Sequence, residues 1–546
     1  SRKVFTTKQQ HKFLKAMEKI AEDNSLRTEN NYTPEEVLNN YGKTVVNEFT
    51  KSYIIDNKSL RSHEEGNIYI HDRKLFPLGV LSDTHLGISK IENFNKIIFN
   101  ILKMKNEVQG EINIPKIDYL LEPYLMNNYK QILKEKVLSY LKVSGFSKYI
   151  NFKKVSEIID KNQEFDFIKE EYEQFILSKN VDYIFKQAFE DAFIKTEEIF
   201  IKELSEFLKI LDNEKKYSIS LGTSSSPAGK LINELILKTL NKINKLENLK
   251  IIFKLTKNNQ SYHESVIKLL LKEKRVIISF IDNSYNKDEC EVEYFSEGIR
   301  IFENINSNKR NSSGRMIVAK TSVNMSRLGL KYQQKPVKDF YKELEEILEI
   351  IKNNLLLSFE TIGNKNKNNY ETLFKNNILD DEKLETSGKI RKVIKNGVLL
   401  IGVVGLTEGV ISLEKDKSKQ YKLMIDILKF LNKKITEFEN DTKLNFAIYE
   451  PEDELVRKEF MALDKAVYGI NKNVTEDSKY DLISNFSSIK NDYLKQAEIQ
   501  RLFSGGNSLE IILPDKTSCK KILYLINELA KKDISFAKIK LGKKVD

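Results

Sequence analysis

The spacing of apolar residues changes along the chain at about residue 215. Before this point the apolar positions recur at helical intervals, as at Phe13, Leu14, Met17 and Ile20, which predicts a helix over 5–20. The stretch Thr33-Pro34-Glu35-Glu36 predicts the start of a second helix, because it combines a threonine cap, a proline at the first position and acids in the first turn. We therefore expect residues 1–60 to form an N-terminal helical region.

Residues 88–212 also show the helical pattern. The segments 116–143 and 181–211 are long and amphipathic, and their outer faces are charged. They predict two extended helices that coat the main body.

From residue 215 onward, short apolar runs alternate with amphipathic segments. Helices are expected over 336–359 and 418–438. The predicted strands are 217–221, 250–255, 275–281, 299–303, 316–323, 398–404, 444–449, 509–513 and 535–541. Such alternation is typical of an α/β fold with largely parallel strands.

The composition narrows the class of protein. Two cysteines among 546 residues favour a reducing compartment without disulfides. No apolar run reaches the roughly 18 residues that a membrane span needs, and the first residues lack the apolar core of a signal peptide. We therefore expect a cytoplasmic protein with no membrane partner.

The net charge is +11, from 90 basic and 79 acidic residues. Acids and bases alternate along the chain instead of forming basic blocks, which indicates a solvated surface and disfavours nucleic acid as a partner. The excess of positive charge still favours the phosphates of nucleotides.

A small-residue stretch joins the strand at 217–221 to the next helix, and it ends in Lys230. Its backbone N–H groups and the start of the helix suit a phosphate, and Lys230 adds a positive charge. The candidate contacts are Gly222, Thr223, Ser224, Ser225 and Lys230. The spacing is not that of a P-loop, and a helix cap without ligand is the alternative.

Two histidines, His63 and His71, lie near acidic residues. Seven residues separate them and part of a strand intervenes, which is not a known spacing of metal ligands. We expect no metal here, and core packing is the better explanation.

Several weak motifs occur in the order found in anaerobic (class III) ribonucleotide reductases, which are glycyl-radical enzymes. They are His63 to Asp72, Gly110 to Asp118, Leu221-Gly222-Thr223-Ser224, Gly314-Arg315-Met316, Gly402 to Glu408, Glu450 to Leu455 and Gly505-Gly506-Asn507. The resemblance covers roughly residues 25–541. It implies a ten-stranded α/β barrel within 61–546, with a dimer interface and a nucleotide effector site in the helices of 88–212.

The residues that carry the radical in this family are replaced. The family's thiyl cysteine lies in a Gly-Cys-Arg step, and the matching step here is Gly298-Ile299-Arg300. The family's second cysteine falls on Gly79. A zinc site of four cysteines cannot be built from Cys290 and Cys519. We therefore expect the zinc ribbon and the glycyl-radical loop to be missing.

A nucleic-acid-binding protein is supported only by the net charge, and two other functions remain open. One is a degenerate homologue that binds nucleotides, such as ATP or a dNTP, as a homodimer or beside an active reductase, with no cofactor of its own. The other is the catalytic core of a split or trimmed reductase, in which Cys290 carries the thiyl and a separate protein carries the glycyl radical. Whether the chain is an enzyme stays open with them.

The resemblance also implies a set of cavity residues: His71, Asp72, Gly79, Ile299, Asn324 and Glu408. Arg315 and Arg327 fall in motifs that line the active cavity of the reductases, where a guanidinium can bind phosphate or a carboxylate. Structural ion pairing is the alternative for both arginines.

Overall fold

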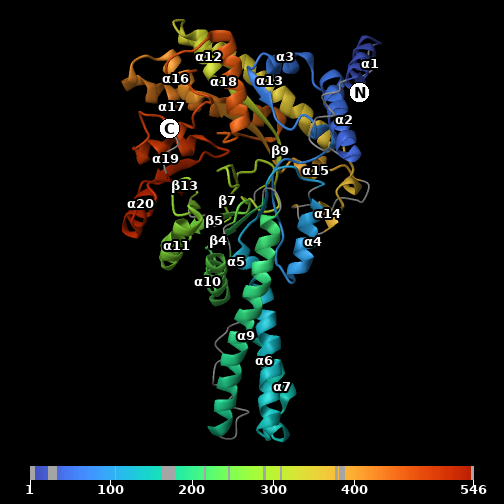
Figure 1. The fold of residues 1–546 in the computed structure, drawn as a ribbon, viewed down its shortest axis with the longest axis vertical. Helices are drawn as coiled ribbons and strands as arrows, with labels where there is room; N and C mark the ends of the chain where they lie inside the picture. Colours follow the sequence, from blue (N-terminus) through green and yellow to red (C-terminus); the bar gives the residue numbers. More distant parts are fainter. Residues whose placement is uncertain are drawn as a thin grey trace.

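The computed structural model describes residues 7–22, 33–104, 106–162, 179–213, 217–243, 246–286, 291–307, 310–375, 379 and 388–542. A large α/β body carries a long helical stalk that projects from one end (Figure 1).

The body is built on two groups of five strands. The first group is β2 (Thr84–His85), β3 (Ile112–Ile114), β4 (Tyr217–Leu221), β5 (Lys250–Leu255) and β6 (Arg275–Phe280). Its neighbours all run parallel. The second group is β9 (Ile317–Asn324), β10 (Val398–Val404), β11 (Asn445–Tyr449), β12 (Leu509–Leu513) and β13 (Phe536–Leu541). Here β9, β10 and β11 are parallel, as are β12 and β13.

Backbone hydrogen bonds close these strands into a ring. At one junction β13 runs antiparallel to β6. At the other, Ile317 N donates to Asp83 O at 2.8 Å, and His85 N donates to Arg315 O at 2.9 Å. Gly505 N, which shortly precedes β12, donates to Ile448 O of β11 at 2.7 Å. The chain thus forms the expected ten-stranded α/β barrel of two five-stranded halves.

The expected barrel strands agree with the observed ones to within a residue or two, except for 299–303. That segment contains β8 (Arg300–Ile301), which pairs with β7 (Glu293–Tyr294) in a hairpin of its own. The prediction of an ordinary strand over 299–303 was therefore wrong. A hairpin packed inside a barrel is as apolar as a barrel strand, so the pattern cannot separate the two.

Helices cover the outside of the barrel, so its strands are buried on both faces. All seven residues of β10 are buried, as expected for a parallel strand between two layers. The longer outer helices are α10 (Pro227–Lys242), α11 (His263–Glu273), α13 (Val337–Gly363), α17 (Lys417–Thr442), α18 (Glu454–Tyr468) and α20 (Cys519–Lys531). The shorter ones are α4 (Phe94–Met104), α12 (Met325–Tyr332), α14 (Glu371–Lys375), α15 (Arg391–Ile394), α16 (Leu406–Leu413) and α19 (Tyr493–Leu502).

The stalk consists of α6 (Glu122–Val143), α7 (Phe152–Lys161) and α9 (Lys179–Asp212), with the short α5 (Ile117–Leu120) at its base (Figure 1). Its two long helices lie where the amphipathic segments predicted them. The outer part has its own hydrophobic cluster, which includes Leu133, Val137 and Phe185 and is separate from the main core.

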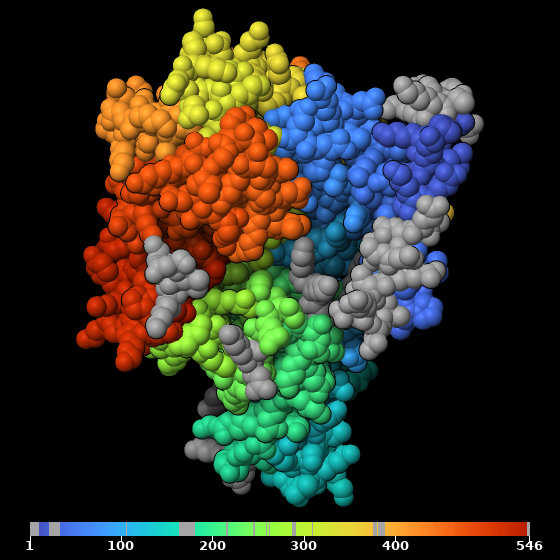
Figure 2. All heavy atoms as spheres, turned by 45° about the horizontal axis from the view of Figure 1, so that its top comes forward, coloured from blue at the N-terminus to red at the C-terminus, as the bar shows by residue number. Residues whose placement is uncertain are grey.

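The N-terminal segment forms α1 (Thr7–Glu22), α2 (Pro34–Phe49), the π-helix η2 (Thr50–Ile54) and α3 (Asn57–Glu64). The predicted cap is present, because Glu36 N donates to Thr33 Oγ1 at 3.2 Å and Thr33 N donates to Glu36 Oε2 at 2.9 Å. The strand β1 (Ile68–Ile70) then pairs antiparallel with β9. Figure 2 shows blue N-terminal segments beside an orange segment of the C-terminal half. The ring centroids of Tyr69 in β1 and Phe460 in α18 lie 6.3 Å apart.

Candidate functional site in the barrel interior

The β7–β8 hairpin presents its tip, residues 295–299, inside the barrel. Gly298 turns the chain with φ +84°, and its N–H donates to Phe295 O at 2.9 Å. Glu111, just before β3, accepts hydrogen bonds from Ser296 N at 2.8 Å and Ser296 Oγ at 2.5 Å. Arg300 N donates to Gly505 O at 2.9 Å. The tip is therefore fastened to both halves of the barrel.

Ile299 occupies the position at which the reductase resemblance places the thiyl cysteine. Its side chain is 2% exposed and belongs to an apolar cluster with Leu400, Ala447 and Tyr449. The hairpin therefore presents hydrocarbon at this position.

Three lysines point into the same interior, and each is paired with a carboxylate. Lys320 Nζ lies 2.8 Å from Asp83 Oδ2, and Lys254 Nζ lies 2.8 Å from Glu293 Oε1. The third pair joins Lys538 of β13 to Glu452. Pairing is the condition on which charges are tolerated away from water.

Glu297, at the hairpin tip, differs from these carboxylates. Glu297 as a whole residue is partly exposed, and within the described residues no side chain or backbone group forms a hydrogen bond or ion pair with its carboxylate. Burial raises the pKa of Glu297, nearby Lys320 opposes that rise, and Glu452 adds to it. Glu297 is therefore an acid with free hydrogen-bonding capacity at the centre of the barrel.

Two further titratable groups hold the interior in place. Burial raises the pKa of Glu111 to about 7, against the hydrogen bonds from Ser218 and Ser296. Burial and the nearby Lys320 lower the pKa of His71 to about 3, so its ring is neutral, and Nε2 lies 2.8 Å from Ser322 Oγ. Both side chains connect elements that are far apart in the sequence.

The predicted phosphate loop leads from β4 into α10 and is partly used by the protein itself. Asp118 Oδ2 accepts hydrogen bonds from Gly222 N at 3.1 Å and Ser224 N at 2.9 Å. The N–H groups of Thr223 and Ser225 have no partner among the described residues, and the Thr223 hydroxyl is buried without one. Two donors of the loop are thus held by Asp118, and two remain for a ligand.

Lys230 is exposed on the first turn of α10. Its side chain forms no hydrogen bond or ion pair among the described residues, and its carbonyl accepts from Tyr262 Oη at 3.4 Å. It lies at the same end of the helix as the loop and is free to meet an anion.

The two predicted arginines have structural contacts. Arg315 is 1% exposed and donates to the carbonyls of Phe302, Asn311, Glu303 and Asn396 at 2.7–2.9 Å. Arg327 Nε lies 2.5 Å from Asp464 Oδ1. Their phosphate role stays a prediction that these contacts do not support.

Asn324 and Gly79 also have structural contacts. Asn324 Nδ2 donates to Asp464 Oδ2 at 2.8 Å, and Asn324 Oδ1 caps α12 at Arg327 N. A Cβ at Gly79 would lie 2.5 Å from Tyr370 Oη, and φ is +86° there, so a cysteine side chain does not fit without rearrangement.

Asp72 and Glu408 are held by contacts with other parts of the chain. Asp72 has φ 54° and accepts from Ser82 Oγ at 3.4 Å. Glu408 of α16 accepts from Asp481 N at 2.9 Å, its Oε2 is buried without a partner, and burial raises its pKa to about 8. Cys290 lies outside the described residues.

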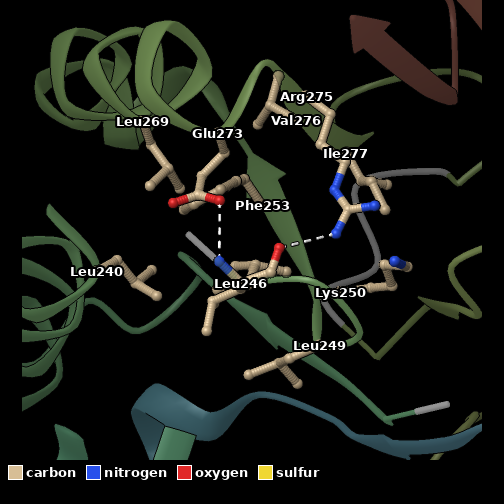
Figure 3. A pocket seen from close by; sticks show the side chains of 11 residues that line it. Leu240, Leu246, Leu249, Lys250, Phe253, Leu269, Glu273, Arg275, Val276 and Ile277 are labelled. Atoms are coloured by element: carbon tan, nitrogen blue, oxygen red, sulfur yellow. Dashed lines mark hydrogen bonds between the residues drawn. The ribbon is translucent and has the colours of Figure 1, made fainter. Parts of the chain in front are cut away.

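A small hollow at the other end of the first half-barrel is structural (Figure 3). Its volume is about 30 Å³, roughly that of one water molecule. Leu246 N donates to Glu273 Oε2 at 3.2 Å, and Arg275 Nη2 donates to Leu246 O at 3.2 Å. These bonds fasten the loop before β5 and leave no room for a nucleotide.

Sequence reasoning missed Glu297 and the interior ion pairs. A signal was present, because Lys254 and Lys320 each stand within a predicted strand next to apolar residues, and Glu297 directly precedes the Gly298-Ile299-Arg300 step. A lysine in such a run indicates a buried partner, although the sequence does not reveal which one.

Comparison with known proteins identifies one matching family. The family model described as anaerobic ribonucleoside-triphosphate reductase matches residues 27–542. No curated protein matches the chain. In the part of the chain that the structure describes, no helix has the length and apolarity needed to cross a membrane.

Solved structures show the same fold at low identity. The anaerobic ribonucleotide reductase from Thermotoga maritima with dATP in the specificity site is 11% identical, with a TM-score of 0.62 over 99% of this chain and 92% of that chain. The same enzyme in complex with dATP and CTP gives 11%, 0.61 and the same coverage. Hydroxyproline dehydratase from Clostridioides difficile is 10% identical, with a TM-score of 0.50 over 96% and 83%.

Proposed function

Because the chain belongs to the anaerobic ribonucleoside-triphosphate reductase family, we propose that it is a degenerate, nucleotide-binding member that does not carry out radical reduction by itself. The observation that carries this proposal is Ile299. It fills the thiyl position of the resemblance and is sealed among apolar side chains at the hairpin tip. A side chain without sulfur cannot form the thiyl that abstracts hydrogen from the ribose.

The nucleotide part of the proposal rests on the loop before α10. Among the described residues the N–H groups of Thr223 and Ser225 have no partner, the start of α10 favours an anion, and exposed Lys230 adds a positive charge. The related enzyme from Thermotoga maritima has been solved with dATP and CTP. We include a homodimer in the proposal, with an active reductase or a separate glycyl-radical protein as partner.

Titration calorimetry of the full chain with ATP, CTP and each dNTP tests nucleotide binding. We expect saturable binding of at least one of them, weakened about tenfold by Lys230→Ala, because one charge-assisted contact to phosphate is lost. Lys242→Ala at the other end of α10 is the matched control and should bind as the unchanged chain does. Titrations that show no heat of binding with any of these nucleotides would contradict the proposed nucleotide binding.

A reduction assay tests the loss of radical chemistry. The full chain, incubated anaerobically with CTP, a separate glycyl-radical protein and its radical-activating system, should give no more deoxynucleotide than a Cys290→Ser variant gives. Turnover that depends on Cys290 would replace the proposal with the split reductase, in which a second chain carries the glycyl radical.

A further inference from the structure

A cavity of about 560 Å³ lies between α11 and α20, outside the barrel interior. Its lining includes Leu255 and Phe280, the last residues of β5 and β6. Ligands of α/β proteins collect at the carboxyl ends of parallel strands, and the volume lies within the range of small-molecule sites. Its position and size therefore suit a ligand.

The lining contains a buried group without a partner. His263, the first residue of α11, is 8% exposed, and its Nε2 is buried with no hydrogen-bond partner among the described residues. Buried polar groups in native proteins are nearly always hydrogen-bonded. A ligand in the cavity can supply the hydrogen bond that this imidazole nitrogen lacks.

The remaining side chains divide by chemistry. Phe280, Leu523 and Ile526 form an apolar wall. Gln260 and Asn527 add amides, each with a donor and an acceptor. Amide side chains of this kind complement the edge of a nucleobase, and an apolar wall suits its face.

Charged groups lie at the rim. Lys257 and Lys531 are exposed there and suit a phosphate, and the carboxylate of Glu264 is exposed in the same lining. Asp282 is beside them and accepts a hydrogen bond from the backbone N–H of Lys257. A carboxylate in this position can accept from the hydroxyls of a ribose, as acidic residues do in dinucleotide sites.

We propose that this cavity is a second nucleotide site, separate from the loop before α10. The base lies against Phe280 and meets His263, while the phosphates meet Lys257 and Lys531. The proposal rests on nucleotide binding by this chain, but it concerns a different place on the surface. Because β5 and β6 belong to the barrel, a ligand here contacts the half that holds Lys254 and the hairpin.

Hydrogen exchange of the full chain, with and without ATP, dATP or CTP, separates the two sites. Peptides 256–264 and 519–531 report on the cavity, and peptides 222–230 report on the loop. Protection of the cavity peptides supports the second site, whether or not the loop is also protected. Protection of the loop alone overturns the second site and leaves the proposed function standing, and protection of neither overturns both.

A variant that fills the cavity controls for indirect protection. Ala530 is exposed on α20 and lines the cavity, so the Ala530→Trp variant should fold normally. It should need at least ten times more nucleotide to reach the same protection of the cavity peptides. Lys520→Trp, exposed on the same helix but away from the cavity, should leave protection unchanged. Equal protection in the chain with Ala530→Trp would overturn the proposal, and His263→Ala checks the same site from the opposite wall.

Discussion

Lys320 Nζ lies 2.8 Å from Asp83 Oδ2 across the junction between the two halves of the barrel. Lys320 belongs to β9, and Asp83 directly precedes β2. The side chains are 15% and 8% exposed. This ion pair therefore holds the junction at which the strand direction reverses.

Replacing Lys320 by methionine should destabilise the protein by about 3–5 kcal/mol, because Asp83 would keep a buried charge without its cation. The measurement is urea unfolding followed by circular dichroism. The exposed pair of Lys195 and Glu198 supplies the control, and Lys195→Met should change the free energy of unfolding by less than about 1 kcal/mol. Equal effects of the two substitutions would show that Lys320 and Asp83 are not coupled as described.

Glu408 should make stability depend on pH. Burial raises the pKa of Glu408 in the folded chain to about 8 from the ordinary 4.5. The folded state therefore binds the proton more tightly, so its contribution to stability is complete below pH 4.5 and is lost as pH rises towards 8. Glu408→Gln cannot titrate and should flatten the fall in the unfolding midpoint between about pH 5 and 8.

Exposed Glu346 supplies the control for this pH series. Glu346→Gln should leave the pH dependence of the unfolding midpoint as it is. A chain with Glu408→Gln that loses stability between pH 5 and 8 as steeply as the unchanged chain would contradict the assignment to Glu408.

Ile299→Cys should place a thiol in the barrel that reagents do not reach. The lost apolar volume should cost about 1–3 kcal/mol. In a chain that also carries Cys290→Ser and Cys519→Ser, dithionitrobenzoate should react with the new thiol only on unfolding. As a control, a chain that keeps the exposed Cys519 should react at once in the folded state. Rapid reaction of the introduced thiol at position 299 in the folded protein would contradict the burial of the hairpin tip.

Most strands from residue 215 onward could be predicted from sequence because short runs rich in strand-forming residues alternate with amphipathic helical segments, whereas the ten-stranded barrel was an expectation from the family resemblance. The runs over 217–221 and 250–255 coincide with β4 and β5. The same rule failed at Arg300–Ile301, because a hairpin inside the barrel has the same apolar neighbours as the barrel wall.

The interior ion pairs could not be predicted. Lys320 and Asp83 are 237 positions apart in the sequence and meet only through closure of the barrel. Arg315 shows the opposite case, since its motif pointed to a ligand and its guanidinium donates to four backbone carbonyls. The sequence can indicate that a side chain has a specific role, but the packing of the folded chain decides which groups that side chain contacts.

The stalk has a thermodynamic consequence. Its outer cluster around Leu133 and Phe185 shares no side chains with the main core. Cooperative melting requires that parts of a protein share buried contacts, so the far end of α6 and α9 can lose its structure while the barrel stays intact. Scanning calorimetry should then show a small heat-absorption peak at a lower temperature than the main one, because the outer stalk unfolds before the barrel does.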